Sequence, residues 1–146
     1  MRTSPTMTVV TGHHHGGDLS RCRQALSGHR LLALSCKEVT RGQGEIWPRS
    51  SSPGSRKGEI SLIQLSTPEE CFLLDVQGKT PKDPVVEFAK EILEDENVCK
   101  IVHDVRGESD ALITVLGIKL RNVHDIQVVR TLPFPECRQN PPFPEV

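Results

Sequence analysis

Several features that mark common functional classes are scarce or absent in this sequence of 146 residues. Aromatic residues make up 3% of the chain and tyrosine is absent, so few side chains can stack on the bases of a single strand. The formal net charge of −1 excludes tight non-specific nucleic-acid binding driven by charge alone. No apolar run approaches the ~18 residues of a membrane span, and the N-terminus lacks the apolar core of a signal peptide.

The cysteines exclude two further kinds of scaffold. Five cysteines are present, an odd number, and no two have Cys-x-x-Cys spacing. Neither a disulfide framework nor a structural zinc site is therefore expected. Together with the missing membrane segment, this pattern predicts an intracellular protein of the cytoplasm or nucleus.

Hydrophobic periodicity predicts one α/β domain, and the chain is long enough to bury a substantial core. Apolar, β-branched runs bounded by turn residues predict strands at 7–11, 30–36, 59–65, 71–76, 100–102 and in a run that ends at 123–125. Helical spacing predicts helices near 19–27, around 85–93 and at 111–116. With the weak first strand set aside, the sheet has about five strands.

A repeated tripeptide marks one unusual segment. Residues 44–46 and 58–60 both read Gly-Glu-Ile, and residues 47–57 between them have the composition of a loop. We interpret 47–57 as an inserted loop; the alternative is a chance repeat of three common residues. The chain is then divided into a lead at 1–6, a domain at 7–130, and a Pro-rich tail at 131–146 that is expected to be disordered.

The order of motifs around the last strands resembles a known family. A polar turn at 103–107 joins a strand to a helix, and the next strand ends in Val-His-Asp at 123–125. With the strand that follows Gly58, this order resembles the 3'-5' exonuclease domain of the DEDD superfamily. The similarity is to its Egalitarian-type, exonuclease 3'-5' domain-containing branch, related to ribonuclease D, over roughly residues 7–130.

The resemblance implies a ribonuclease-H-like fold. Such a fold has a central mixed sheet of about five strands with helices on both faces, and the C-terminal helices of the family are missing from this sequence. The strands near Leu31 and Lys100 should be adjacent and parallel. The strands at 59–65 and 71–76 should form an antiparallel hairpin.

The family cleaves nucleic acid with two divalent ions, Mg²⁺ or Mn²⁺, which hard carboxylates hold. Its first motif, Asp-x-Glu, matches Ser35, Cys36 and Lys37, so both acids are replaced. An ammonium at Lys37 opposes a cation by like-charge repulsion. The nearest acid, Glu38, points to the opposite face in a regular strand. Glu38 becomes a ligand only if the strand is slipped or bulged, and it is otherwise a solvated residue at a strand end.

The second family motif places an acid in the first helical turn after a strand. That position is Glu108, which keeps an oxygen ligand on an arm one methylene longer than aspartate. The alternative is that Glu108 only complements the dipole of the helix. Asp104 and Asp110 are the other acids near this turn.

The remaining polar residues have weaker assignments. By resemblance, His103 and Arg106 face a nucleic-acid backbone, and Asp125 ties the turn together. A histidine at a strand end is, alternatively, a satisfied structural residue. The run at 13–15 is three histidines, which either chelate a metal or form a solvated loop. The third family motif requires a tyrosine or histidine and an aspartate on a late helix, and it is not found.

Three functions therefore remain open. The first is a metal-dependent 3'-5' exonuclease that acts on a single-stranded 3' end of RNA or DNA. The second is a catalytically impaired pseudo-exonuclease that binds nucleic acid or a protein, or associates with itself through an uncovered sheet face. The third is a truncated fragment without independent activity. The altered acids favour impaired catalysis, because each lost carboxylate weakens the hold on a divalent ion.

Overall fold

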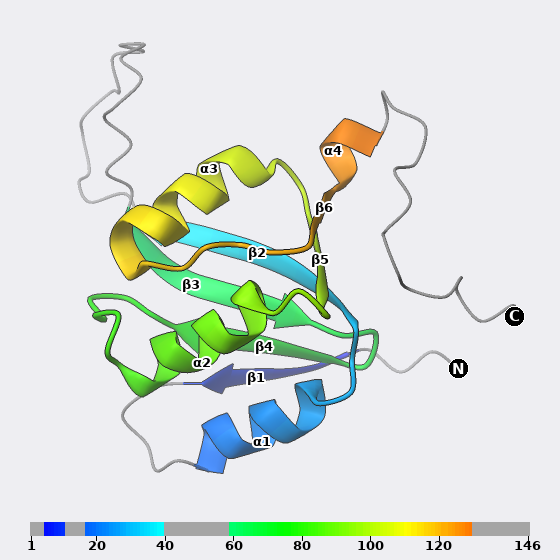
Figure 1. The fold of residues 1–146 in the computed structure, drawn as a ribbon. Helices are drawn as coiled ribbons and strands as arrows, with labels where there is room; N and C mark the ends of the chain where they lie inside the picture. The colour runs from blue at the N-terminus through cyan, green and yellow to red at the C-terminus, as the bar shows by residue number, and fades with distance from the viewer. Residues whose placement is uncertain (1–4, 11–16, 40–58, 130–146) are drawn as a thin grey trace, which may run out of the picture.

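A computed structural model describes residues 5–10, 17–39 and 59–129 of this chain (Figure 1). A six-stranded sheet has the order β1-β4-β3-β2-β5-β6. Its strands are β1 (Thr6–Val10), β2 (Leu31–Val39), β3 (Glu59–Ser66), β4 (Glu70–Asp75), β5 (Cys99–Val102) and β6 (Val123–Asp125). The helices are α1 (Gly17–Leu26), α2 (Pro84–Glu94), α3 (Val105–Ala111), the π-helical turn η1 (Leu112–Leu116) and α4 (Ile126–Val129).

The connections decide which face of the sheet the helices cover. Strand β3 runs antiparallel to its neighbours β2 and β4, while β1 pairs with β4, β2 with β5, and β5 with β6 in parallel. Helices α1, α2 and α3 each connect parallel strands, and each connection moves the same way across the sheet. Because such crossovers are right-handed, all three helices lie on one face. Figure 1 shows α2 in front of the sheet, flanked by α1 and α3.

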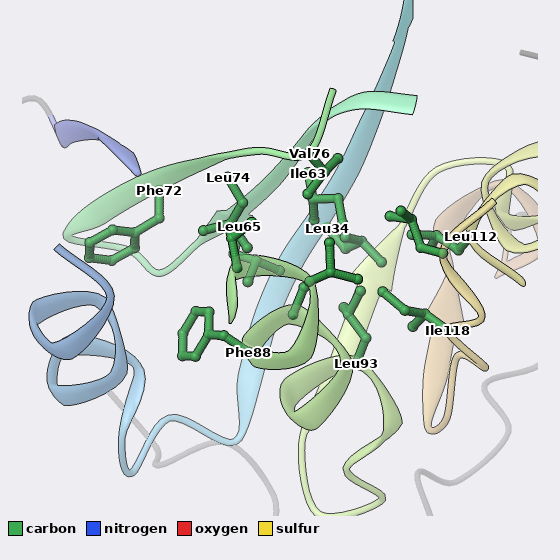
Figure 2. Packing of buried hydrophobic residues seen from close by; sticks show 14 of the residues in the cluster. Leu34, Ile63, Leu65, Phe72, Leu74, Val76, Phe88, Leu93, Leu112 and Ile118 are labelled. Atoms are coloured by element: carbon green, nitrogen blue, oxygen red, sulfur yellow. The ribbon is translucent and has the colours of Figure 1, made fainter. Parts of the chain in front are cut away.

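The hydrophobic core fills the space between that face and the helices. Phe88 and Leu93 of α2 pack against strand residues that include Leu34 and Leu65 (Figure 2). Leu112 of η1 and Ile118 extend the cluster beyond the sheet centre. These side chains are 0–4% exposed, and burying each one contributes ~1.5–3 kcal/mol.

The opposite side of the sheet, which we term the open face, carries exposed apolar side chains. Met7 and Val9 of β1 are 66% and 53% exposed, and Leu31 of β2 is 38% exposed. Pairing places them on one face, because Met7 and Val9 lie beside Cys71 and Leu73 of β4. None of the crossover helices of the described residues reaches this face.

Most of the predicted architecture is confirmed. The sheet is mixed, β3 and β4 form the antiparallel hairpin, and β2 and β5 are parallel neighbours. Two details are corrected. The sheet has six strands rather than about five, because β1 pairs with β4 along its full length. Helices cover one face, not both, within the described ranges, because every described crossover turns the same way.

Some predicted segments lie outside the described residues. They are the histidine run at 13–15, the repeat at 44–46, the loop at 47–57 and the tail at 131–146. No helix within the described ranges is both long enough and apolar enough to cross a membrane.

Candidate functional site at the carboxyl edge of the sheet

The candidate site lies where β2, β5 and β6 end. These three strands are parallel, so their carboxyl ends meet at one edge of the sheet. Strand β2 pairs with β5 only from Leu31 to Ala33 and then continues to Val39. Among the described residues, the edge of β2 beyond Ala33 therefore has no strand partner on the β5 side. The backbone N–H groups of that edge need another acceptor.

Glu108 supplies the acceptor for one of these groups. Its Oε1 accepts a hydrogen bond from the backbone N–H of Cys36 at 3.0 Å. Helix α3 follows β5 directly, so its first turn carries Glu108 into the gap between β5 and β2. This bond brings Glu108 to the part of β2 that carries Ser35, because Cys36 is the neighbour of Ser35 in β2.

The second oxygen of Glu108 has a different environment. Oε2 is buried and has no hydrogen-bond partner among the described residues. Burial raises the pKa of Glu108 above its usual value of 4.5, while the Cys36 N–H and the charge of Lys37 lower it. Asp104 and Asp125 add a smaller upward contribution to that pKa. The net effect is upward, which is typical of a carboxylate that is desolvated without a full set of donors.

Lys37 stands at the end of the regular part of β2. It lies opposite Leu62 of β3, and Ser35 lies opposite Gln64, which places both on the open face. Lys37 is exposed, and its charge acts on Glu108. The Lys37 carbonyl accepts a hydrogen bond from Ser61 Oγ at 3.0 Å, which fixes the backbone here.

The register of β2 and β3 shifts immediately after Lys37. Glu38 pairs with Ile60, so Ser61 of β3 is the extra residue and β2 keeps its alternation. A bulge at this point was the condition for Glu38 to act as a ligand, but the extra residue lies in the partner strand. The side chain of Glu38 itself lies outside the described residues.

The turn between β5 and α3 is held by Asp125 of β6. Asp125 Oδ1 accepts the N–H groups of Asp104 and Gln127 at 3.0 and 2.9 Å, and Oδ2 accepts the N–H of Val105 at 2.9 Å. These bonds, the Val105 N–H first, hold the pKa of Asp125 below its usual 3.8. Asp104 takes a left-handed conformation with φ 59°, which is uncommon outside glycine. This arrangement agrees with the structural role expected of Asp125.

The other polar residues of the turn face solvent. His103 and Arg106 are exposed, and Arg106 Nε lies 3.5 Å from Asp104 Oδ1. His103 contributes to the lowered pKa of Asp125, so both basic residues lie at the carboxyl edge. Asp110 is exposed on α3. The assignment of His103 and Arg106 to nucleic-acid binding stays a prediction.

Lys119, a further basic residue that could contact phosphate, lies away from this site. Lys119 precedes β6, and its N–H binds Glu94 at the end of α2, so it lies at the amino edge of the sheet. Arg41, Arg49, Arg56 and Lys57 lie outside the described residues.

The described residues do not fit a pair of divalent ions. Within these ranges, no three His, Cys, Asp or Glu side chains come together as a metal site. Both oxygens of Asp125 accept backbone N–H groups, and Glu108 offers one unpartnered oxygen beside the charge of Lys37. Mg²⁺ requires several oxygen ligands in near-octahedral geometry. The Mg²⁺ or Mn²⁺ expected from the resemblance therefore lacks most of its protein ligands in this part of the chain.

A comparison with known protein families matches the part of the chain that carries Glu108 and Asp125. A family model described as "3'-5' exonuclease" matches residues 49–132, more than half of the chain. The chain belongs to the 3'-5' exonuclease family. The match includes β3 to β6 and with them Glu108 and Asp125.

Curated relatives share part of this exonuclease domain. The chain is 35% identical over 81 residues to the piRNA biogenesis protein EXD1 of Mus musculus, and equally so to that of Homo sapiens. Each match covers 54% of this chain and 14% or 15% of the relative. The exonuclease-family chain thus spans a small part of the length of these relatives.

Solved structures share the fold over most of the chain. RNase D of Trypanosoma brucei in complex with RNA U12 has a TM-score of 0.67 and 27% identity, covering 87% of this chain and 39% of that one. The EXD2 exonuclease domain soaked in Mn has a TM-score of 0.60 and 18% identity, covering 86% and 57%. The second likeness shows the fold alone.

One contact at the site was not predicted from the sequence. The spacing of motifs identified Glu108, but nothing indicated that its carboxylate would bind the Cys36 N–H. A local signal exists, since β2 is longer than its parallel neighbour β5 and therefore leaves N–H groups without a strand partner. That signal depends on strand lengths, which sequence patterns fix poorly.

Proposed function

We propose that this exonuclease-family domain binds the single-stranded 3' end of RNA and does not hydrolyse it. The observation that carries the proposal is the composition of the first acid motif. Ser35 and Lys37 stand where the family has two carboxylates. They flank Cys36 in β2, and the Cys36 N–H binds Glu108. A serine and an exposed lysine retain polar contact with a phosphate backbone but cannot hold a divalent cation in common with Glu108.

RNA binding is supported by a relative that was solved with RNA and by the basic residues at the carboxyl edge of the sheet. The T. brucei relative with 27% identity was solved with RNA U12. In this chain Lys37, His103 and Arg106 are all exposed at the edge where β2 and β5 end. Exposed basic groups supply the salt-dependent part of nucleic-acid binding. With few aromatic residues, we expect the backbone rather than base stacking to provide most of the affinity.

Hydrolysis is opposed by the state of the one retained acid. In two-metal hydrolysis the ions activate water and stabilise the leaving oxygen, so the ligand set determines the rate. Oε1 of Glu108 already accepts a hydrogen bond from the Cys36 N–H. Burial raises the pKa of Glu108 and so favours the neutral carboxyl group. At this site, Glu108 holds the end of β2 against α3, and exposed basic residues present positive charge. Neither role supplies the activated water that hydrolysis of a phosphodiester bond requires.

The test uses 5'-labelled oligouridylate of 12 nucleotides, with oligothymidylate as a second substrate. Purified protein is incubated with each in millimolar Mg²⁺ or Mn²⁺, and products are resolved on a denaturing gel while binding is followed by fluorescence anisotropy. We expect retention of the RNA without shortening. Stepwise 3' shortening that disappears in Glu108→Ala would overturn the proposal, as would the absence of binding. Tighter binding of the DNA would reassign the ligand.

A further inference from the structure

The position of Lys37 carries a more specific inference about this site. We propose that the Lys37 ammonium takes the place of a divalent cation as the phosphate contact, so that RNA binds without Mg²⁺ or Mn²⁺. The inference rests on the proposed function and goes beyond it, because binding without hydrolysis could still require a metal ion.

The backbone geometry fixes where Lys37 projects. Lys37 pairs with Leu62, and the register shift begins at the next residue, so Lys37 is the last β2 residue before the bulge. Ser61 Oγ donates to the Lys37 carbonyl at 3.0 Å, and Glu108 accepts the N–H of the preceding residue, Cys36, at 3.0 Å. Side chains from β3 and α3 therefore hold the peptide unit that follows Lys37 and the one between Ser35 and Cys36.

The charge of Lys37 is placed for a ligand rather than for a protein partner. Among the described residues, no hydrogen bond or ion pair joins its ammonium to another side chain or to the backbone, and the side chain is exposed. Its charge nevertheless reaches Glu108. Lys37 follows Cys36, whose N–H binds Glu108, so the ammonium extends from β2 next to the residue that Glu108 contacts. Its hydrogens remain available to an anion from solvent.

The same charge disfavours a metal ion here. Coulomb repulsion between Lys37 and a divalent cation is twice that with a monovalent one at equal distance. Lysine binds phosphate as a compact point charge with three donors. Glu108 then acts as a positioning residue, because it holds the end of β2 through the Cys36 N–H and does not itself contact the anion.

Arg106 and His103 are the other basic residues at the carboxyl edge. Both are exposed, and Arg106 is tied to Asp104 at 3.5 Å, so its charge is partly neutralised. Asp125 is occupied by backbone N–H groups. Among the described residues of this edge, Lys37 is the cation best placed to meet a phosphate group.

The experiment measures anisotropy of labelled 12-nucleotide oligouridylate in EDTA and in Mg²⁺, over a range of KCl concentrations. Wild-type protein should bind equally in both at matched ionic strength. Lys37→Met should weaken binding several-fold and reduce the slope of log K against log salt by ~0.7, the value for one phosphate contact on a single strand. Lys37→Glu should bind only when Mg²⁺ is present. Lys119→Met, at the amino edge, is the matched control and should bind like wild type.

The outcomes separate this inference from the proposed function. Wild-type binding that requires Mg²⁺ would overturn the inference and leave the proposed function standing. Loss of binding in every buffer would overturn the proposed function itself. An unchanged salt slope in Lys37→Met, with a thermal melt like that of wild type, would show that another cation contacts the phosphate and would also refute the inference.

Discussion

Lys100 offers a quantitative test of how the fold is held together. The side chain of this β5 residue is fully buried. Its Nζ donates to the carbonyl oxygens of Ile92 and Asp95 at 3.2 and 2.7 Å, at the end of α2. Burial lowers the pKa of Lys100 from 10.5 to about 8, although the negative charge of Asp95 acts in the opposite direction. Lys100 thus donates hydrogen bonds to carbonyl groups at the end of α2. The burial of its ammonium group opposes folding.

The sign and size of the effect follow from proton linkage. Between pH 8 and 10.5 the unfolded chain binds a proton at Lys100 that the folded chain has released, so stability rises with pH. Below pH 8 both states are protonated, and the full cost of the buried charge applies. At ~1.36 kcal/mol per pH unit, that cost is about 3 kcal/mol.

The perturbation is Lys100→Met, which keeps the length of the side chain and removes the charge. The two carbonyls remain satisfied, because Ile92 O also accepts the Asp95 N–H and Asp95 O the Val98 N–H. We therefore expect the variant to be more stable than wild type by up to about 3 kcal/mol at pH 7. This advantage should shrink as the pH approaches 10.5.

The assay is urea unfolding followed by circular dichroism at several pH values from 7 to 10. Exposed Lys90→Met is the control and should parallel wild type. Burial also raises the pKa of Cys22 from 9.0 to about 12, so folded protein loses stability above pH 9. That loss is common to both proteins and cancels in the comparison. Parallel pH profiles for wild type and Lys100→Met would refute the reasoning.

Three further predictions concern the turn, the open face and the end of η1. Asp125→Ala should lower the free energy of unfolding by about 2 kcal/mol, because three backbone N–H groups lose their acceptor. Since the folded pKa of Asp125 is depressed, this contribution is present above pH 3.8 and lost as the pH falls through the folded pKa, as acid titration of both proteins would show. Val9→Thr should reduce self-association in sedimentation equilibrium, whereas Ile126→Thr, also exposed, should not; equal effects would exclude the open face as the contact. Gly117→Ala should cost about 1 kcal/mol in urea unfolding because φ is 68°, and an unchanged midpoint would contradict this strain.

The sequence predicts the order of strands and helices because each element carries its own periodicity. The amphipathic pattern of α2 places Val85, Phe88, Ala89 and Leu93 in the core, as expected. At the end of the next helix the pattern is less reliable. Helical spacing over 111–116 predicts that Val115 lies on the buried face with Leu112 and Leu116. It is 36% exposed because η1 has a π-helical turn, which rotates the residues that follow.

Tertiary contacts limit the prediction elsewhere. Strand β1 is the weakest of the predicted strands. Two of its apolar residues stay exposed in the structure, and its place in the sheet depends on β4, far along the chain. Lys100 lies in an apolar run, and nothing local indicates that its ammonium reaches the end of α2. The site residues Ser35, Lys37 and Glu108 were identified by motif order, whereas the bond that joins β2 to α3 was not.

The pairing of β1 has a consequence for how the chain folds. Its register joins Thr6 to Glu70 and Val10 to Leu74, so β1 cannot take its place in the sheet until β4, which follows it in the chain, has formed. Closing such a long segment lowers the conformational entropy of the chain before the contacts between β1 and β4 can stabilise it. The hairpin of β3 and β4 is local and can form earlier as a template. We therefore expect β1 to join the sheet late and to exchange its amide hydrogens sooner than β3, which is paired on both sides.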